Sequence, residues 1–282
     1  ARHIWVSGAL RTRVEVPNSD ELLAAPGCYT TARVKNGRAL FHRAHCQRLL
    51  ADAQALGLPA PKPEQVTEAF ETLGRAEFGQ GSGIVRIKIC SDTSGGLVLV
   101  GEPRALDPEP VSWRAGIAPF PHPGPGEHPG AKLTDHPEIG RARDLRTQTG
   151  HDETLLFDAR GNLVEGVRSS LVVVDADGAR RTPGPELGGV ASIALAMARE
   201  RSPIPIEPTL RISREHVARA RELIALNAVR GARAITRLEG QVIASGEPGP
   251  VCRELERLLK NDTHLPCQRV PGHAPQVMTV YQ

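Results

Sequence analysis

Residues 131–166 read AKLTDHPEIGRARDLRTQTGHDETLLFDARGNLVEG, and the stretch predicts a lysine, a helix and a hairpin in succession. Glycine and proline residues precede Lys132, so the lysine is expected at a break in the chain and outside any long helix. A helix is predicted over residues 137–148, with Pro137 near its start, where the missing N–H costs nothing. The apolar run 154–157 then predicts a buried strand.

The hairpin that follows ends in a carboxylate. Residues 158–162 predict a turn, residues 163–164 begin the return strand, and Glu165 comes directly after them. A lysine on one element and a carboxylate on a later hairpin could serve pyridoxal phosphate, because an amine bonds to its aldehyde and a carboxylate keeps its ring nitrogen protonated. Without further context, such a pair is more often two unrelated surface charges.

Composition describes an ordinary globular chain. Its 282 residues are enough for one large or two moderate domains, and they are 40% hydrophobic and 24% charged. The aromatic share of 3% and the net charge of +3 argue against a nucleic-acid surface and favour small anionic ligands. No apolar run reaches the roughly 18–20 residues of a membrane helix, and the N-terminus lacks a signal-peptide layout. Five scattered cysteines without a CxxC pair predict reduced thiols in a cytoplasmic protein, with no metal site.

The N-terminal part of the chain alternates short strands with two longer helices. Asn36-Gly37 is a type I′ hairpin signal between two strands, and Leu49 and Ala53 belong to one apolar face of the helix that follows. The predicted strands lie at 4–6, 13–16, 28–35, 38–41, 84–90 and 98–100, and the predicted helices at 21–25, 42–57 and 63–78.

Within this part, residues 27–58 (GCYTTARVKNGRALFHRAHCQRLLADAQALGL) resemble the N-terminal signature of the fold type IV, or class IV, pyridoxal-phosphate enzymes. That family includes branched-chain aminotransferases, D-amino acid aminotransferases and 4-amino-4-deoxychorismate lyases, and the wording GCYTTARV is closest to the lyases. In the family, the arginine of an H-x-x-R-L motif holds the cofactor phosphate, and Arg48 is the matching residue, three places after His45. A planar guanidinium is the preferred bidentate partner of phosphate.

The resemblance implies specific roles for residues of the second half. The family places its cofactor-binding lysine before a helix, and a hairpin then brings a carboxylate to the pyridine nitrogen, so Lys132 and Glu165 match these two groups. Backbone amides near Val190 and Ala191 would hold the phosphate at the start of a helix that opens at residues 187–195 and runs to about residue 201. A second phosphate-contacting loop is implied at the pair Asn227 and Ala228.

The same resemblance predicts an α/β (α+β type) protein of two domains. A smaller N-terminal α/β domain is expected over residues 1–103 and a larger C-terminal pseudo-barrel domain over residues 113–282. The proline-rich residues 102–110 mark the connection, and the linker is placed at 104–112. The remaining elements are strands at 113–118, 169–174, 222–226 and 232–238 and helices at 214–220 and 249–260, whereas the tail 265–282 has no obvious role.

A loop dense in proline, glycine and histidine lies just before the lysine. Residues 119–130 contain His122 and His128, and His136 follows. Their spacing fits no common metal site, and we interpret the loop as a mobile rim.

Two activities fit these residues. A 4-amino-4-deoxychorismate lyase forms pyruvate and 4-aminobenzoate, a folate precursor, whereas a class IV aminotransferase moves the amine of a D- or branched-chain amino acid to a keto acid. In both, the Lys132 amine acts as general base. Thr30 and Thr31 are candidates for assisting the substrate. Arg33 and Arg86 are candidates for binding its carboxylate, although each also fits an ordinary salt-bridged surface residue.

Departures from the family pattern support two further hypotheses. Residues 23–31 lack the Gly-Asp of the common entry motif, Ser169-Ser170 replaces Ser-Asn, and Ala191 replaces a frequent threonine, so a non-catalytic relative is the third hypothesis. A small-molecule binding or scaffold protein without cofactor is the fourth. We favour a cytoplasmic, homodimeric lyase that acts on a small amino substrate, with no nucleic-acid or membrane partner.

Overall fold

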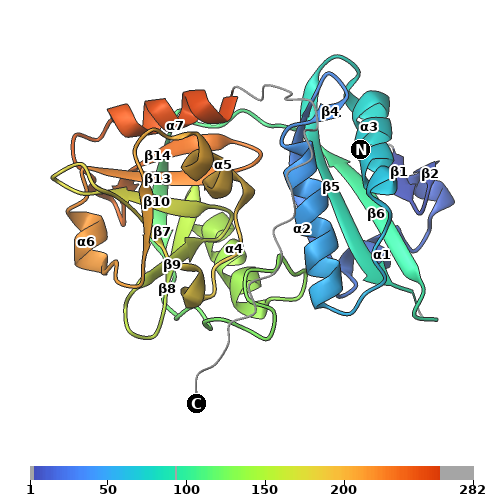
Figure 1. Ribbon diagram of the computed structural model, residues 1–282, viewed down its shortest axis with the longest axis horizontal. Coiled ribbons are helices and arrows are strands. Elements are labelled where there is room, and N and C mark those ends of the chain that lie inside the picture. Colours follow the sequence, from blue (N-terminus) through green and yellow to red (C-terminus); the bar gives the residue numbers. More distant parts are fainter. Residues whose placement is uncertain (1–2, 93, 261–282) are drawn as a thin grey trace.

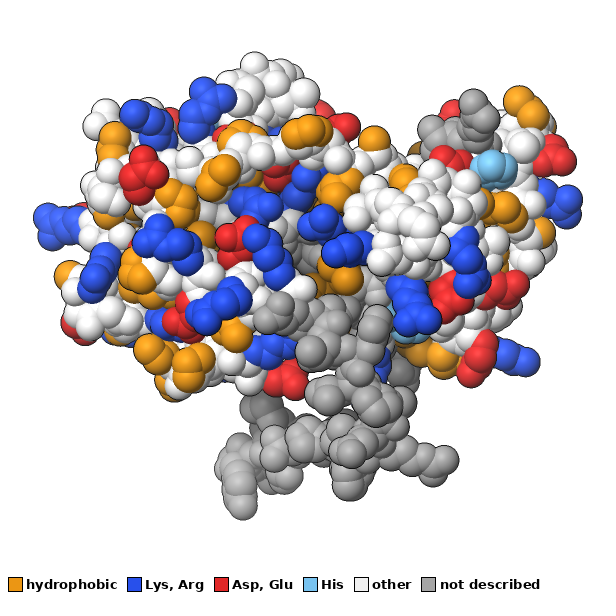
Figure 2. Space-filling model, turned by 90° about the horizontal axis from the view of Figure 1, so that it is seen from above, with side chains coloured by type: hydrophobic (Ala, Val, Ile, Leu, Met, Phe, Trp, Pro, Cys, Tyr) orange, Lys and Arg blue, Asp and Glu red, His pale blue; other side chains and the backbone are white. Residues whose placement is uncertain are grey.

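The computed structural model describes residues 3–92 and 94–260, so the tail 265–282 lies outside the described residues. Two lobes lie side by side, each built around its own β-sheet (Figure 1), which confirms the predicted mixed, two-domain fold class. Within the described ranges, no helix is long and apolar enough to cross a membrane. Seen from above, lysine and arginine side chains gather around the hollow between the lobes (Figure 2).

The N-terminal lobe contains a six-stranded antiparallel sheet in the order β2-β1-β6-β5-β3-β4. Asn36 and Gly37 have φ angles of +52° and +71°, as a type I′ turn requires, so the predicted hairpin is confirmed. The strands are β1 (His3–Val6), β2 (Ala9–Thr12), β3 (Cys28–Lys35), β4 (Arg38–Ala39), β5 (Ser82–Ser91) and β6 (Leu97–Arg104).

The strand predicted at residues 13–16 is wrong. Arg13–Glu15 form a short 3₁₀ helix, η1. The Glu15 carboxylate accepts the backbone N–H of Thr12 at 2.7 Å and its hydroxyl at 2.8 Å. This local capping competes with an extended conformation and turns the chain.

The connection between the lobes is shorter than its composition suggested. Strand β6 continues through Glu102 to Arg104, because Glu102 pairs with Arg86 in the β5–β6 ladder. The next strand begins at Ser112, so residues 105–111 link the two sheets. The domain boundaries at residues 103 and 113 stay a prediction.

Helices α2 (His42–Ala55) and α3 (Pro63–Phe78) cover one face of the N-terminal sheet (Figure 1). Their apolar side chains pack with those of β3 and β5 in one buried core. Because side chains alternate along a strand, the opposite face carries Tyr29, Arg86 and Glu102. Helix α1 (Ser19–Ala24) closes one end of that face, where the buried Lys88 amine donates to backbone carbonyls at the end of α1.

The C-terminal lobe is a nine-stranded sheet that curls on itself. Its order is β12-β11-β10-β13-β14-β7-β8-β9, with β15 beside β14. Strands β9 and β10 are far apart in this order, yet only residues 167–169 connect them. The Leu163 N–H of β9 also donates to the Ile212 carbonyl, just after β12, at 2.8 Å. The two ends of the sheet therefore meet, which confirms the predicted pseudo-barrel.

Apolar side chains such as Trp113, Leu155 and Leu223 form one of the cores of this lobe. Its strands are β7 (Ser112–Ile117), β8 (Glu153–Phe157), β9 (Leu163–Gly166), β10 (Ser170–Val174), β11 (Arg180–Pro183), β12 (Ile206–Thr209), β13 (Glu222–Asn227), β14 (Gly231–Leu238) and β15 (Gln241–Val242). Its helices are α4 (Pro137–Thr149), η2 (Pro185–Leu187), α5 (Ile193–Arg201), α6 (Arg214–Ala218) and α7 (Pro250–Lys260).

Candidate active site

Lys132 follows β7 in the sequence but is held against the N-terminal sheet. Its carbonyl accepts the Tyr29 N–H at 3.0 Å, and the Thr134 N–H donates to the Gly27 carbonyl at 2.9 Å. Strand β4 pairs only with the far end of β3, so residues 131–134 occupy the part of the β3 edge that β4 leaves free. The lysine therefore lies at a break between elements, as predicted.

Helix α2 contacts the same segment through a buried carboxylate. Asp52 is 7% exposed, and its Oδ2 accepts the Lys132 backbone N–H at 3.0 Å. Burial raises the pKa of Asp52, against the opposing effects of the Lys132 amide and the Arg48 charge. The peptide groups on both sides of the Lys132 α-carbon thus have fixed partners.

The Lys132 amine lies near the ring of Tyr29. Its Nζ is 5.1 Å from the ring centroid, and the guanidinium carbon of Arg86 is 4.2 Å from the same centroid. The positive charge of Lys132, more than that of Arg86, lowers the pKa of the buried Tyr29 phenol to about 8. A phenol with this pKa beside an amine can take part in proton transfer near neutral pH.

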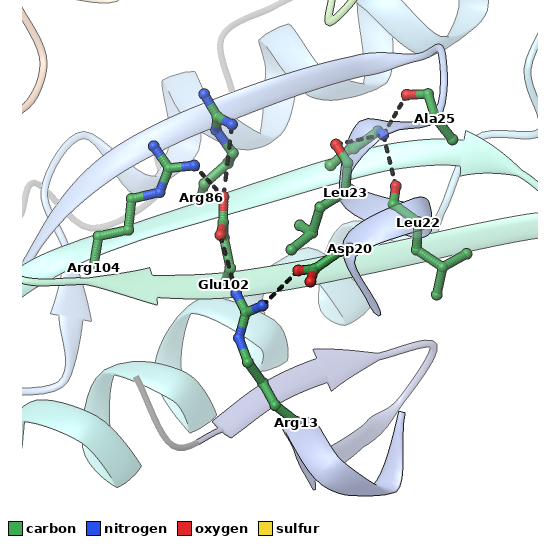
Figure 3. Close-up of polar contacts among 9 residues, drawn as sticks. Arg13, Asp20, Leu22, Leu23, Ala25, Arg86, Glu102 and Arg104 are labelled. Atoms are coloured by element: carbon green, nitrogen blue, oxygen red, sulfur yellow. Dashed lines mark hydrogen bonds and ion pairs between the residues drawn. The ribbon is translucent and has the colours of Figure 1, made fainter. Parts of the chain in front are cut away.

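Arg86 is fixed by a buried carboxylate on the neighbouring strand. Glu102 is 6% exposed and contacts three guanidinium groups (Figure 3), those of Arg86 at 3.6 Å, Arg13 at 3.5 Å and Arg104. Arg13 also pairs with Asp20 at 2.9 Å. Three arginines share two carboxylates here, and the excess of positive charge favours an anionic ligand on this face.

Glu165 lies on β9 and is 7% exposed. Its Oε2 accepts the Val190 N–H at 2.9 Å, and its Oε1 lies 3.5 Å from Nε2 of His122. His122 Nδ1 accepts the Gly124 N–H at 3.0 Å, so a neutral His122 ring carries its proton on Nε2, facing Glu165. Both carboxylate oxygens therefore have a neighbour inside the protein.

The interpretation of residues 119–130 as a mobile rim is wrong at His122. This side chain is 3% exposed. Its backbone N–H donates to the Phe157 carbonyl of β8 at 2.7 Å. The loop thus turns inward and places one histidine behind Glu165.

Arg48 projects from α2 towards β3. Its Nη2 donates to the Thr30 hydroxyl, whose oxygen also lies 2.6 Å from Nδ1 of His45. Thr30 is fully buried, so its hydroxyl faces these two groups and orients Arg48. Thr31, the next residue, is partly exposed on the opposite face of the sheet, which also carries Arg86.

A cavity of about 580 Å³ lies between α2 and the segment that leads into α5. Lys132 is not in the described wall of this cavity, but Gly130, two residues before it, and Asp52, which accepts its N–H, are. The wall brings together residues from both lobes: Arg48, Asp52, Gly130, Glu165, Val190 and Ala191.

The amides of Val190 and Ala191 precede helix α5 and do not belong to its first turn, contrary to the prediction. The helix begins at Ile193, because Ser192 caps it by accepting the Leu195 N–H at 3.2 Å. The Val190 N–H donates to Glu165, and the Ala191 N–H donates to the Gly130 carbonyl at 2.8 Å. Phosphate binding by these two amides stays a prediction, and it requires that both hydrogen bonds are exchanged.

The second predicted phosphate loop lies apart from the cavity wall. Asn227 Oδ1 accepts the N–H groups of Val229 and Arg230 at 3.1 and 2.7 Å, so this side chain closes its own turn. Neither Asn227 nor Ala228 is in the described wall of the cavity, and the predicted substrate residues Thr31, Arg33 and Arg86 are not in it either. Their predicted roles are not supported by proximity to Glu165 and Arg48.

The donor set fits pyridoxal phosphate, which needs an amine, a carboxylate for its ring nitrogen and donors for its phosphate. The buried Nε of Arg48 has no hydrogen-bond partner among the described residues, so it is available to a phosphate oxygen. A Cβ at Gly189 would lie 3.3 Å from the Val164 carbonyl oxygen and 3.5 Å from Glu165 Oε2, so a side chain at this position would crowd the wall beside Glu165. The described residues include no group of three or more His, Cys, Asp or Glu that could hold a metal ion.

Four residues of this site were assigned no role in it from the sequence, and one of them, His122, was considered only as a metal ligand. Asp52 stands one helical turn after Arg48, and Tyr29 directly precedes the two threonines. Their closeness in sequence to predicted site residues could therefore have identified both as candidates. His122 and Glu102 could not be identified in this way, because the contacts that give them a role are formed only between segments distant in sequence.

Comparison with known proteins agrees with this geometry. A model of the family described as amino-transferase class IV matches residues 27–238, more than half of the chain. No curated protein gives a significant match.

Solved structures share the fold at low sequence identity. The branched-chain amino acid aminotransferase from Escherichia coli is 19% identical, with a TM-score of 0.76 over 91% of this chain and 92% of that chain. A hypothetical aminotransferase from Mycobacterium tuberculosis, in its pyridoxal-phosphate-bound form, is 16% identical, with a TM-score of 0.77 over 92% and 98%. A protein provisionally assigned as 4-amino-4-deoxychorismate lyase from Legionella pneumophila is 17% identical, with a TM-score of 0.73 over 86% and 93%.

Proposed function

The chain belongs to the class IV amino-transferase family, with pyridoxal 5′-phosphate as its cofactor, and we propose that it is a 4-amino-4-deoxychorismate lyase. The products would be 4-aminobenzoate and pyruvate. An aminotransferase acting on D- or branched-chain amino acids would use the same cofactor residues, so the substrate side of the site must distinguish the two.

The observation that supports a lyase is the positive charge beside the Lys132 amine. Arg86 lies over the Tyr29 ring, and Arg143 and Arg48 also lower the pKa of that phenol. The lyase substrate carries two carboxylates and is well matched to such a surface. A branched-chain amino acid presents an apolar side chain, which would be better matched by an apolar wall.

The chemistry assigned to this chain is a proton transfer followed by an elimination. When bound, pyridoxal phosphate supplies an electron-withdrawing ring that stabilises negative charge at the substrate carbon. The Lys132 amine removes the proton from the carbon that carries the substrate amino group. The C–O bond to the three-carbon side chain then breaks, the departing enolate takes up the proton held by the Lys132 amine and leaves as pyruvate, and the remaining six-membered ring becomes aromatic. Thr31, partly exposed on the same face as Arg86, is the candidate hydroxyl for orienting the substrate.

The cofactor would be held from both lobes. Arg48 would bind the phosphate through its guanidinium, and Glu165 would pair with the ring nitrogen. The amides of Val190 and Ala191 add phosphate donors once they leave their present acceptors.

Three further features belong to this proposal. The protein would act as a homodimer in the cytoplasm. Its N-terminal domain would span residues 1–103 and its C-terminal domain residues 113–282, joined by the linker 104–112.

The first test is the absorption spectrum of the purified protein with pyridoxal phosphate, repeated on Lys132→Ala. A visible band that borohydride bleaches, and that the variant lacks, is expected. Lys35→Ala, at an exposed lysine on the far end of β3, is the matched control and should keep the band. Failure of the wild-type protein to take up the cofactor would overturn the enzyme proposal.

The second test separates the activities on the loaded enzyme. Formation of 4-aminobenzoate and pyruvate from 4-amino-4-deoxychorismate, without any keto acid, is the expected result. Amine transfer that depends on a keto acid would replace the lyase by an aminotransferase. Cofactor uptake with neither product would identify a non-catalytic relative.

A further inference from the structure

We propose that Asp52 is a positioning residue that holds the Lys132 segment against helix α2 and thereby directs the lysine amine. The inference rests on the proposed function for the importance of that amine. Its structural core, a hydrogen bond between a helix of one lobe and a segment that follows β7 of the other, can be tested without cofactor.

The geometry supports a role in placing the main chain of Lys132. The Asp52 Oδ2 accepts the Lys132 N–H at 3.0 Å, while the Lys132 carbonyl accepts the Tyr29 N–H from β3 at 3.0 Å. With one anchor on each side of the α-carbon, both peptide planes that flank Lys132 are fixed. The starting direction of its side chain follows from those planes.

A simple pairing of Asp52 with Arg48 does not account for this arrangement. The two residues are one helical turn apart, yet the terminal nitrogen of Arg48 donates to Thr30, and the Asp52 carboxylate accepts from Lys132. The positive charges of Arg48 and Lys132 both lower the pKa of Asp52 and so favour its ionised form, although burial has the larger, opposite effect.

The position is costly for an acid, which points to a function. Asp52 is buried and lines the cavity one helical turn after Arg48. Burying a carboxylate destabilises the fold unless its partners compensate. An apolar or small side chain would complete this helix face without that cost, so the carboxylate is explained by what it binds.

The decisive measurement is backbone amide exchange of the cofactor-free protein at single-residue resolution. Asp52→Leu removes the acceptor and should speed exchange of the Lys132 amide by at least about tenfold, since a hydrogen bond to a charged group is lost. Asp52→Asn keeps an oxygen acceptor and should raise the rate only a few-fold. The Thr134 amide, which donates to Gly27, serves as an internal reference and should change little in Asp52→Asn.

A matched control and a binding measurement complete the test. Asp177→Leu removes an exposed aspartate that accepts the Ala179 N–H in the β10–β11 turn, and it should leave the Lys132 amide unchanged. The dissociation constant of pyridoxal phosphate should rise about tenfold in Asp52→Leu and only a few-fold in Asp52→Asn. If Asp52→Leu does not fold, the few-fold change in Asp52→Asn decides the question.

The outcomes distinguish this inference from the proposed function. Exchange at Lys132 that equals the wild-type rate in both variants would overturn the role of Asp52, whether or not the protein binds cofactor. Faster exchange with unchanged cofactor affinity would overturn the effect on the amine. Faster exchange in a protein whose wild type takes up no cofactor would instead overturn the proposed function and leave the structural contact established.

Discussion

The site has two walls that are built in different ways. The lysine wall consists of residues 131–134, held on β3 and α2 by contacts between the lobes. The carboxylate wall consists of Glu165 on β9, with Val190 and His122 behind it, and all three belong to the C-terminal lobe. Lys132 therefore depends on how the two lobes meet, whereas Glu165 depends on the fold of one lobe alone.

Substitutions in the two walls should therefore have different effects. A change in the carboxylate wall should act locally, on the charge next to the ring nitrogen. A change in the lysine wall should also alter the order of a segment between the lobes. Variants in each wall test that distinction.

The largest effect is expected for Glu165→Gln. The amide can still accept the Val190 N–H, but the negative charge is lost, so the developing charge on the substrate carbon is stabilised less. Turnover should fall about 10²-fold, as for other single preorganised electrostatic groups, while amide exchange at Lys132 stays at the wild-type rate. Steady-state kinetics and exchange on the same sample check both halves, and a loosened Lys132 segment would contradict the separation of the walls.

Arg48→Lys should weaken cofactor binding by about tenfold or more. Lysine keeps one positive charge but cannot offer the planar, bidentate donor set of arginine. It also cannot reproduce the contact with Thr30 in the same orientation. The dissociation constant of pyridoxal phosphate, measured by absorption titration, is the readout, and Arg43→Lys on the exposed side of α2 is the control.

His122→Ala should have a smaller effect, a few-fold increase in the same dissociation constant. The ring N–H that faces Glu165 Oε1 is lost, while Val190 still holds Oε2. An asparagine at this position retains a donor and should recover part of the affinity. Substitution of His128, which is only partly buried, should leave binding unchanged, and an equal effect of both alanines would refute a specific contact.

The free energy of unfolding should depend on pH through the ionisation of Asp52. Burial raises its pKa, so the folded protein binds the Asp52 proton more tightly than the unfolded chain does, and the stability present at acid pH is lost as pH rises through the raised pKa. Asp52→Asn cannot ionise and escapes this loss. The free energy of unfolding in urea, compared over acid to neutral pH, should therefore shift in favour of the variant as pH rises. A difference that does not vary with pH would contradict the assignment.

The smallest effect is expected on the pKa of the Tyr29 phenol, measured by ultraviolet absorption. Tyr29 should form its phenolate with a pKa of about 8, and Lys132→Ala should raise that pKa towards the ordinary value, because the lysine charge is the largest cause of the shift. The chain has two tyrosines, so Tyr29→Phe identifies the signal in an ultraviolet titration. An unchanged midpoint in Lys132→Ala would show that the amine does not lie beside this ring in solution.

Elements with local signals could be predicted from the sequence. Asn36-Gly37 defines its turn through backbone conformation, and the α3 bounds at Pro63 and Phe78 agree with the apolar spacing and the proline at the start. The strand expected at residues 13–16 failed because a side-chain cap outcompeted a pattern of β-forming residues.

The residues of the site also differ in how far the sequence predicts them. Arg48, Lys132 and Glu165 stand in motifs with characteristic spacing, so the sequence alone was enough to propose them. Asp52 and His122 could not be proposed in this way, because an aspartate on a helix or a histidine in a loop has no function until a distant segment folds against it. The start of α5 was misplaced because a serine cap at Ser192 is hard to distinguish from the small residues before it.

The amides of Val190 and Ala191 have a consequence for the time course of activation. Because they donate to Glu165 and Gly130, these amides have acceptors within the protein, and on the proposed function cofactor entry trades these bonds for new ones. Such an exchange lowers the net gain per contact and adds a barrier that simple diffusion lacks. The speed of this exchange, as well as the final affinity, would then determine how quickly the protein becomes active.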